Sequence, residues 1–244
     1  MLNTRTAKYP GTDRVTMQLK ALLFDVDNTL LDFSRFKRES ALAAAKAIRK
    51  AGVNEDERAL YKKIFGIYDE KGIEYQNTFH DLLLRYNLSP NLHERAKQAA
   101  IIGYQKKKYA LLRPRPKVIR TLSVLQKRFK LGIVTDAPRE KAWQRLVLSG
   151  LDHFFEVVVT LDDTNELKPS RKPFLRALSQ LGVTPGEALF VGDNPERDVL
   201  GAKKAGITTC FAKYGCIDYT PEREVADFTL ERFEDLQKVV EELE

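Results

Sequence analysis

Four aspartates of this 244-residue sequence stand where they could meet in one site. Asp25 and Asp27 follow one apolar run, and Asp193 and Asp198 follow a second run far along the chain. If the four carboxylates meet, each pair at about 4 Å costs about 4 kcal/mol at an effective dielectric constant of about 20. A hard divalent cation, Mg²⁺ by preference, suits such an oxygen-only site. The sequence therefore predicts a magnesium site.

The spacing of Asp25 and Asp27 lets these two carboxylates take different roles in one reaction. A carboxylate that stays ionised beside a metal is a nucleophile, whereas a carboxyl group that is protonated part of the time is a general acid and then a general base. Mg²⁺ and the ammonium group of Lys168 would change the formal charge of the four aspartates from −4 to −1, so an anionic substrate needs further donors such as Thr135. This division of roles fits phosphoryl transfer through a covalent aspartyl-phosphate.

The elements that must position these residues alternate between helix and strand after Pro116. This alternation is typical of βαβ units, so we predict an α/β fold with a doubly wound parallel sheet. Apolar runs predict its strands at residues 21–26, 131–134, 157–160, 188–191 and 207–211. Ligands of such sheets bind beyond the carboxyl ends of the strands. The polar residues found there are Asp25, Asp27, Thr135, Asp136, Asp162, Asp163 and Asp193.

One predicted helix, over residues 138–149, follows the strand that ends before Thr135. Trp143, Leu146 and Val147 have helical spacing along it, so we expect them to form its packed face.

The segment between the first two strands has helical patterns alone. Capping residues and apolar periodicity predict four helices within residues 34–112. We therefore expect a helical cap inserted into an α/β core that comprises residues 18–33 and 113–244. Residues 1–17 lack periodicity and are expected to form a loose leader.

Four motifs resemble, in order, those of the haloacid dehalogenase superfamily. The first resembles D-x-D-x-T and spans residues 24–30; the others are Val134-Thr135-Asp136, Lys168-Pro169, and Gly192-Asp193 with Asp198. The resemblance covers residue 20 to about residue 212. It implies a subfamily I hydrolase, in which a Rossmann-like core carries a four-helix type 1 cap. The acid at position 27 favours the phosphatase branch, because the dehalogenases usually have a non-acidic residue there.

The resemblance also implies a role for each site residue. Asp25 would attack phosphorus, and Asp27 would protonate the leaving oxygen and then activate water. Thr135, Asp136 and Lys168 would contact the substrate, and Lys168 would also offset the charge of the nucleophile. The implied Mg²⁺ ligands are Asp25, Asp27 through its backbone carbonyl, Asp193, and Asp198 directly or through water.

Several functions remain open. The leading hypothesis is a Mg²⁺-dependent phosphatase acting on a small phosphorylated metabolite; a dehalogenase or a phosphoryl mutase would use the same chemistry. A phosphoacceptor signalling module is a different class with a similar acidic pocket. No nucleic-acid-binding motif or membrane span is recognisable, and the first twenty residues lack the apolar core of a secretory signal, so we expect a cytoplasmic enzyme. The oligomeric state is left open.

The net charge of +7 comes entirely from the predicted cap. Residues 34–112 contain 16 Lys and Arg against 9 Asp and Glu, and the rest of the chain is balanced. Cations such as Arg35, Lys37 and Arg38 could draw phosphate esters towards the acidic edge of the core, and solubility of an outer face is the equal alternative.

Overall fold

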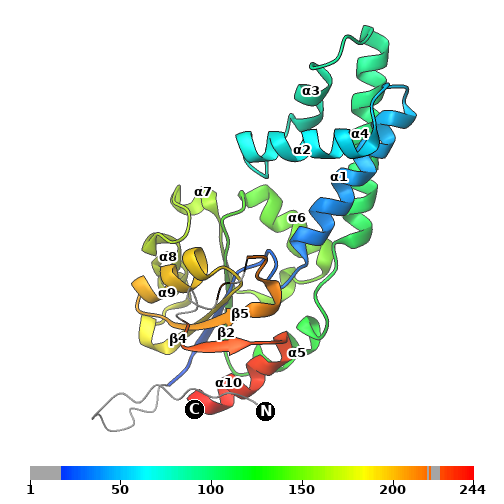
Figure 1. The fold of residues 1–244 in the computed structure, drawn as a ribbon. Coiled ribbons are helices and arrows are strands. Elements are labelled where there is room, and N and C mark those ends of the chain that lie inside the picture. Colours follow the sequence, from blue (N-terminus) through cyan, green and yellow to red (C-terminus); the bar gives the residue numbers. More distant parts are fainter. Residues whose placement is uncertain (1–17, 219, 221–225) are drawn as a thin grey trace.

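One six-stranded parallel sheet forms the centre of the protein (Figure 1). The computed structural model describes residues 18–218, 220 and 226–244, so the expected leader over residues 1–17 lies outside the described residues. The strand order β3-β2-β1-β4-β5-β6 confirms the predicted doubly wound α/β fold. The sequence analysis missed the last of the six strands, which are β1 (Ala21–Phe24), β2 (Lys130–Val134), β3 (Val157–Val159), β4 (Ala188–Gly192), β5 (Thr208–Ala212) and β6 (Phe228–Leu230).

Helices cover both faces of the sheet, which is why β1 and β4 consist of buried residues alone. Side chains of α5 (Val118–Leu125) and α10 (Leu236–Leu243) pack with Leu22 and Phe24 on one face. On the other face, α8 (Arg171–Leu181) and α9 (Leu200–Lys204) pack with Leu23 and Phe190. Alternate residues of β1 therefore enter two different hydrophobic clusters, as expected of a central strand. None of the helices in the described part of the chain has the length and apolar composition needed to cross a membrane.

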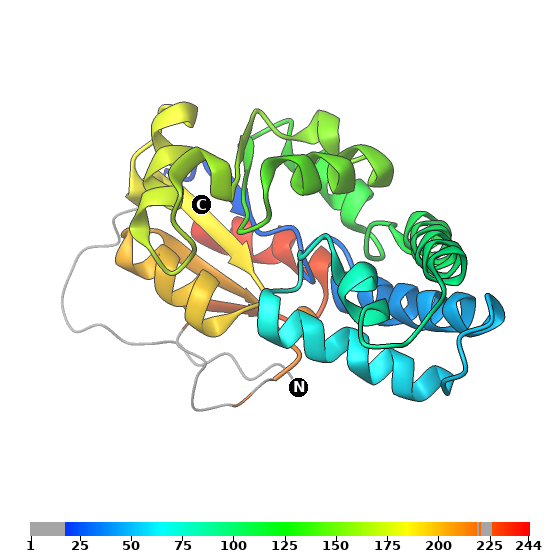
Figure 2. The ribbon, with the colours of Figure 1, turned by 90° about the horizontal axis from the view of Figure 1, so that it is seen from above.

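Four helices follow β1 and gather on one side of the α/β core (Figures 1 and 2). They share a hydrophobic cluster of their own, which includes Ile48, Leu60 and Ile64. The long helices approach closely at Gly103, where a Cβ atom would lie 3.0 Å from the carbonyl oxygen of Ala43. We propose that this cluster is the core of the cap expected over residues 34–112. Its helices are α1 (Phe33–Lys50), α2 (Glu57–Lys71), α3 (Thr78–Leu83) and α4 (Pro90–Leu111).

The remaining helices connect strands of the core. They are α6 (Arg139–Ser149) and the short α7 (Leu161–Thr164), together with a widened turn, Pro195–Val199, that leads into α9. Left-handed Gly150 ends α6, as a residue without a Cβ can.

The separate cluster of the cap predicts a stability difference between two of its leucines. Leu60 is fully buried, whereas Leu84 is 64% exposed. We expect Leu60→Ala to lower the free energy of unfolding by about 2–5 kcal/mol and Leu84→Ala by less than about 1 kcal/mol. Denaturant unfolding of both variants measures the difference, and equal losses would contradict the packing.

Candidate active site

The register of the sheet brings three predicted site residues to neighbouring strand ends. Phe24 of β1 is paired with Ile133 of β2 on one side and with Val191 of β4 on the other. The residues directly after β1, β2 and β4 are Asp25, Thr135 and Asp193, and all three are buried. The structure thus places side chains from distant parts of the sequence at the carboxyl edge of the sheet, as predicted for a doubly wound fold.

Three carboxylates and one ammonium group form the centre of this edge. Oxygen atoms of Asp25, Asp193 and Asp198 all lie within 4.8 Å of one another. The Nζ atom of Lys168 lies 2.7 Å from Oδ1 of Asp25 and 2.6 Å from Oδ1 of Asp198, and it donates to the carbonyl oxygen of Val134 at 3.1 Å. Lys168 is 4% exposed, so its charge faces the carboxylates in a poorly hydrated environment.

Three buried carboxylates face one ammonium group in this cluster, so the cluster lacks positive charge. The pKa of Asp193 is raised to about 9, mainly by burial and further by the Asp198 and Asp25 carboxylates. The pKa of Asp25 is raised to about 7, also mainly by burial, although Lys168 opposes the shift. Burial lowers the pKa of Lys168, but the neighbouring carboxylates outweigh burial and the net shift is upward. A divalent cation would supply the missing charge, and an oxygen-only donor set suits Mg²⁺.

The hydrogen bonds show which carboxylates are most available to a cation. Asp198 accepts from Lys168 through Oδ1 and from the backbone N–H of Asn194 through Oδ2, at 2.6 and 3.0 Å. Asp193 has one long bond to the rest of the described chain, in which the Thr29 hydroxyl donates to its Oδ1 at 3.4 Å. The residues present therefore fit a metal held most directly by Asp25 and Asp193, with Asp198 nearby.

Asp27 lies beside this cluster but turns its carboxylate elsewhere. Its Oδ2 accepts from Nη1 of Arg145 at 2.6 Å, and its buried Oδ1 has no hydrogen-bond partner within the described residues. Burial raises the pKa of Asp27, although Arg145 opposes the shift. The next residue, Asn28, adopts a left-handed conformation with φ of 62°, which asparagine tolerates better than most residues. Of the four aspartates in the predicted metal set, only Asp27 has its carboxylate outside the cluster.

Thr135 and Asp136 serve different parts of the site. The Thr135 hydroxyl accepts from the backbone N–H of Ala137 at 3.2 Å and lines the cavity described below. Asp136 accepts from the backbone N–H of Lys168 at 2.9 Å, and its second oxygen lies 3.4 Å from Nη1 of Arg197. Asp136 thus fixes the loop that carries the lysine.

A cavity of about 400 Å³ opens over these residues between the core and the cap. Asp25, Asp27 and Thr135 line it from the core, and Lys37 and Glu74 line it from the cap. Arg38 also lines it, whereas Arg35 is exposed and not part of its lining. Two of the three cap cations considered from the sequence therefore reach this cavity.

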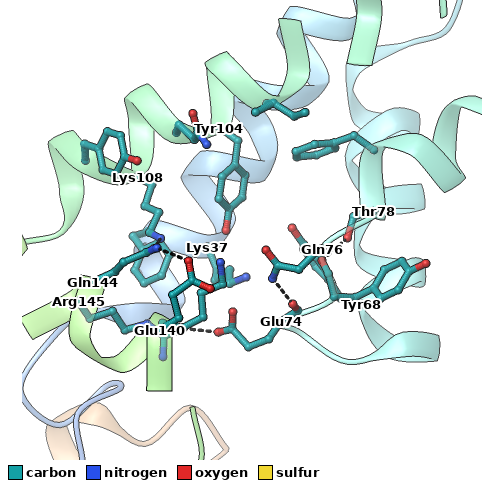
Figure 3. Close-up of a pocket in the computed structure, with 17 residues that line it drawn as sticks. Lys37, Tyr68, Glu74, Gln76, Thr78, Tyr104, Lys108, Glu140, Gln144 and Arg145 are labelled. Carbon is teal, nitrogen blue, oxygen red and sulfur yellow. Dashed lines mark hydrogen bonds and ion pairs between the residues drawn. The ribbon is translucent and has the colours of Figure 1, made fainter. Parts of the chain in front are cut away.

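Arg145 is a site residue that the sequence analysis missed. It is 2% exposed and forms an ion pair with Asp27 of the core. Through Nη2 it forms a second ion pair, with Glu74 of the cap (Figure 3). Its guanidinium carbon also lies 4.7 Å from the centroid of the Phe33 ring. Arg145 thus joins the two parts of the chain at the candidate active site.

The expected packing of α6 is wrong for two residues. Trp143 and Val147 are 41% and 59% exposed, and the buried face consists of Ala142, Arg145, Leu146 and Ser149. The helix is turned so that Arg145 reaches its two carboxylate partners. Residues 142, 145, 146 and 149 also have helical spacing. The signal available in the sequence was therefore a second helical face, on which an arginine stands among mostly small residues.

The motif residues and their geometry agree with a comparison to known proteins. A family model described as haloacid dehalogenase-like hydrolase matches residues 22–212. The chain belongs to this family. It is 37% identical over 231 residues to the glyceraldehyde 3-phosphate phosphatase of Methanopyrus kandleri, which covers 92% of this chain and 98% of the relative.

Solved structures of other haloacid dehalogenase-like proteins have the same fold. A HAD phosphatase of Thermococcus onnurineus is 30% identical, with a TM-score of 0.65 and coverage of 91% of this chain and 98% of that one. A Bacillus subtilis protein determined bound to magnesium is 25% identical, with a TM-score of 0.66 and coverage of 91% and 99%. The likeness in both cases spans core and cap.

The buried guanidinium predicts a large effect of Arg145→Gln in this hydrolase. The substitution leaves Asp27 and Glu74 without their counter-charge, and breaking a fully buried pair costs about 3–5 kcal/mol. Because both carboxylates are 24% exposed, we expect a smaller loss of unfolding free energy, about 2 kcal/mol. Arg139→Gln on the same helix removes a 57% exposed arginine and should cost less than about 1 kcal/mol. Denaturant unfolding compares the two, and a loss no larger for Arg145→Gln would refute the assignment.

The raised pKa values predict a pH-dependent stability in the absence of metal. The folded state retains protons on Asp25 and Asp193 that the unfolded state has lost, so stability falls as the pH rises towards about 9. In EDTA, wild-type protein should lose stability relative to Asp193→Asn between about pH 6 and about pH 9, and excess Mg²⁺ should remove this loss. Thermal unfolding across this range measures it. Parallel pH profiles for the two proteins in EDTA would contradict the cause given for the shift.

Proposed function

We propose that this protein is a Mg²⁺-dependent phosphatase that hydrolyses a small organic phosphomonoester through an aspartyl-phosphate. The observation that carries the proposal is the buried cluster of Asp25, Asp193 and Asp198 around Lys168, with Asp27 two residues from the nucleophile in the same cavity. The name of the Methanopyrus kandleri relative supports a phosphatase.

In the first step, a carboxylate oxygen of Asp25 attacks phosphorus and the bond to the leaving oxygen breaks. Asp27 gives its proton to that oxygen, so the products are an alcohol and the aspartyl-phosphate. Burial raises the pKa of Asp27 and so favours its protonated form, and its Oδ1 is free of other hydrogen bonds within the described residues. Lys168 holds Asp25 at 2.7 Å and limits the repulsion between this carboxylate and the phosphate.

In the second step, Asp27 accepts a proton from water, whose oxygen attacks the phosphorus of the aspartyl-phosphate. The phosphorus–Asp25 bond breaks, inorganic phosphate leaves, and the nucleophile is restored. Thr135 donates to a phosphoryl oxygen, since its hydroxyl lines the cavity and, among the residues that the structure describes, accepts only from the Ala137 N–H. One group therefore acts as acid and then as base.

The metal would be held by Asp25, Asp193 and the backbone carbonyl of Asp27, with Asp198 acting directly or through water. When bound, it would neutralise negative charge on the nucleophile and the phosphoryl oxygens. Asp198 is the residue best suited to act through water, because both of its oxygens accept hydrogen bonds from the protein.

The cavity favours a small substrate with a polar leaving group. Its volume of about 400 Å³ suits a metabolite of a few carbons. Lys37, Arg38 and Arg197 add cations to its lining, while Phe65 and Ile73 give it an apolar side. A triose phosphate is the class we favour, in keeping with the name of the relative. The partners are then small metabolites, and the enzyme is expected to act in the cytoplasm.

The test is turnover of two substrates by wild type and three variants. With Mg²⁺, wild type should release phosphate from an aryl phosphate and, faster, from glyceraldehyde 3-phosphate, and EDTA should abolish both activities. Asp25→Asn should have no turnover, and Asp27→Asn should be slower by about 10²–10⁴-fold. Asp162→Asn is the matched control, because Asp162 follows β3 at the same edge but does not line the cavity.

Other outcomes would identify the alternatives. Turnover by Asp25→Asn would refute the nucleophile. A stable phosphoprotein without phosphate release from wild type would favour the phosphoacceptor module. Transfer of the phosphoryl group to a second hydroxyl of a sugar phosphate would favour a mutase, and halide release from a haloacid would favour a dehalogenase.

A further inference from the structure

A second cavity of about 370 Å³ lies between the cap and α6 (Figure 3). We call it the cap cavity. Its walls come from α1, α2, α3, α4, α6 and the loop between α2 and α3. Lys37, Glu74 and Arg145 line both this cavity and the candidate active site, whereas the active-site aspartates of the described chain do not line it.

The cap cavity holds more positive than negative charge. Glu74 is paired with Arg145, which leaves Glu140 as the other acidic residue of a lining that also contains Lys37, Lys108 and Lys141. Within the described residues, none of these three ammonium groups has a carboxylate within 4.0 Å. Figure 3 shows the Lys37 and Lys108 side chains on the cap side of the cavity, above the Glu74–Arg145 pair.

Burial beside other cations disfavours the charged forms of Lys37 and Lys108. Lys37 is 7% exposed, and its Nζ donates to one backbone carbonyl, that of Ile73, at 2.7 Å. Burial lowers the pKa of Lys37 to about 8, although Glu74 opposes the shift; Arg145 and Lys108 lower it further. Burial, Arg145 and Lys141 likewise lower the pKa of Lys108. A bound anion would compensate this charge, as a cation would compensate the carboxylates of the active site.

The rest of the lining suits an organic anion. Phe36 and Phe79 give the cavity an apolar side, and Tyr68, Tyr104 and Thr78 contribute hydroxyl groups. The volume is within the range of small-ligand sites. An anion with a short carbon skeleton would meet both kinds of surface.

We propose that the cap cavity is a second binding site, for a small organic anion that carries a phosphate or phosphonate group and a carboxylate. Lys37, Lys108 and Lys141 recognise its charges. The site is connected to the active site by a shared wall, because Arg145 contacts Glu74 in the cap cavity and Asp27 in the catalytic one. A ligand there would therefore act on the enzyme from outside the substrate site.

The test is calorimetric titration with phosphonoacetate, which phosphatases of this kind do not hydrolyse because it has no phosphate ester. EDTA is present throughout, so that no metal can hold the probe against the active-site carboxylates. Wild type and Asp25→Asn should bind with the same affinity, and Lys108→Gln should bind at least about tenfold more weakly, a difference of about 1.4 kcal/mol. Lys106→Gln removes an exposed lysine of the same helix and should stay within about twofold of wild type.

Three results would overturn the proposal. They are no saturable binding to wild type, an affinity of Lys108→Gln equal to that of Lys106→Gln, and an affinity of Asp25→Asn that differs from that of wild type. The last result would place the probe in the catalytic cavity. Thermal unfolding of each variant checks that it is folded. Because no turnover is measured, the outcome is independent of the proposed phosphatase activity.

Discussion

Charge repulsion among buried carboxylates governs how the rest of this site is built. Asp25, Asp193 and Asp198 have oxygens within 4.8 Å of one another, and two such charges at about 4 Å repel by about 4 kcal/mol at an effective dielectric constant of about 20. Lys168 is the group that offsets this repulsion within the chain, and Asp136 holds its backbone in place.

The fold provides the closeness that this cluster requires. Gly192 is the last residue of β4. A Cβ atom at this position would lie 2.6 Å from the carboxylate of Asp198, so a larger residue would displace this aspartate. The neighbouring strand ends then leave Asp25 between Thr135 and Asp193. Sheet register, a glycine and one lysine thus hold together acids that are separated by more than 160 residues in sequence.

The sequence pointed to the aspartates of this edge because Asp25 and Asp193 come directly after recognisable apolar runs, whereas Lys168 was found only through its motif. Arg145 had no such marker: the aromatic Trp143 and the branched Val147 dominate the apparent face of α6, yet both are exposed. A helix face is decided by its partners, here Asp27 and Glu74, which lie 118 and 71 residues away. The strand β6 was missed because its three residues, Phe228–Leu230, have a threonine at their centre and form no apolar run, unlike the three valines of β3.

The net charge of the cap does not describe its electrostatics fully, because a count of charges does not separate buried from exposed residues. Arg35 and Lys106 are exposed, and their fields are screened within about 8 Å at physiological ionic strength. Lys37 is buried, and its field acts on both cavities with little screening. A composition counts these residues equally, whereas their effect on an anion depends on burial. An ammonium group that lines a cavity, such as that of Lys37, therefore acts more strongly on an anion bound there than an exposed charge of the cap does.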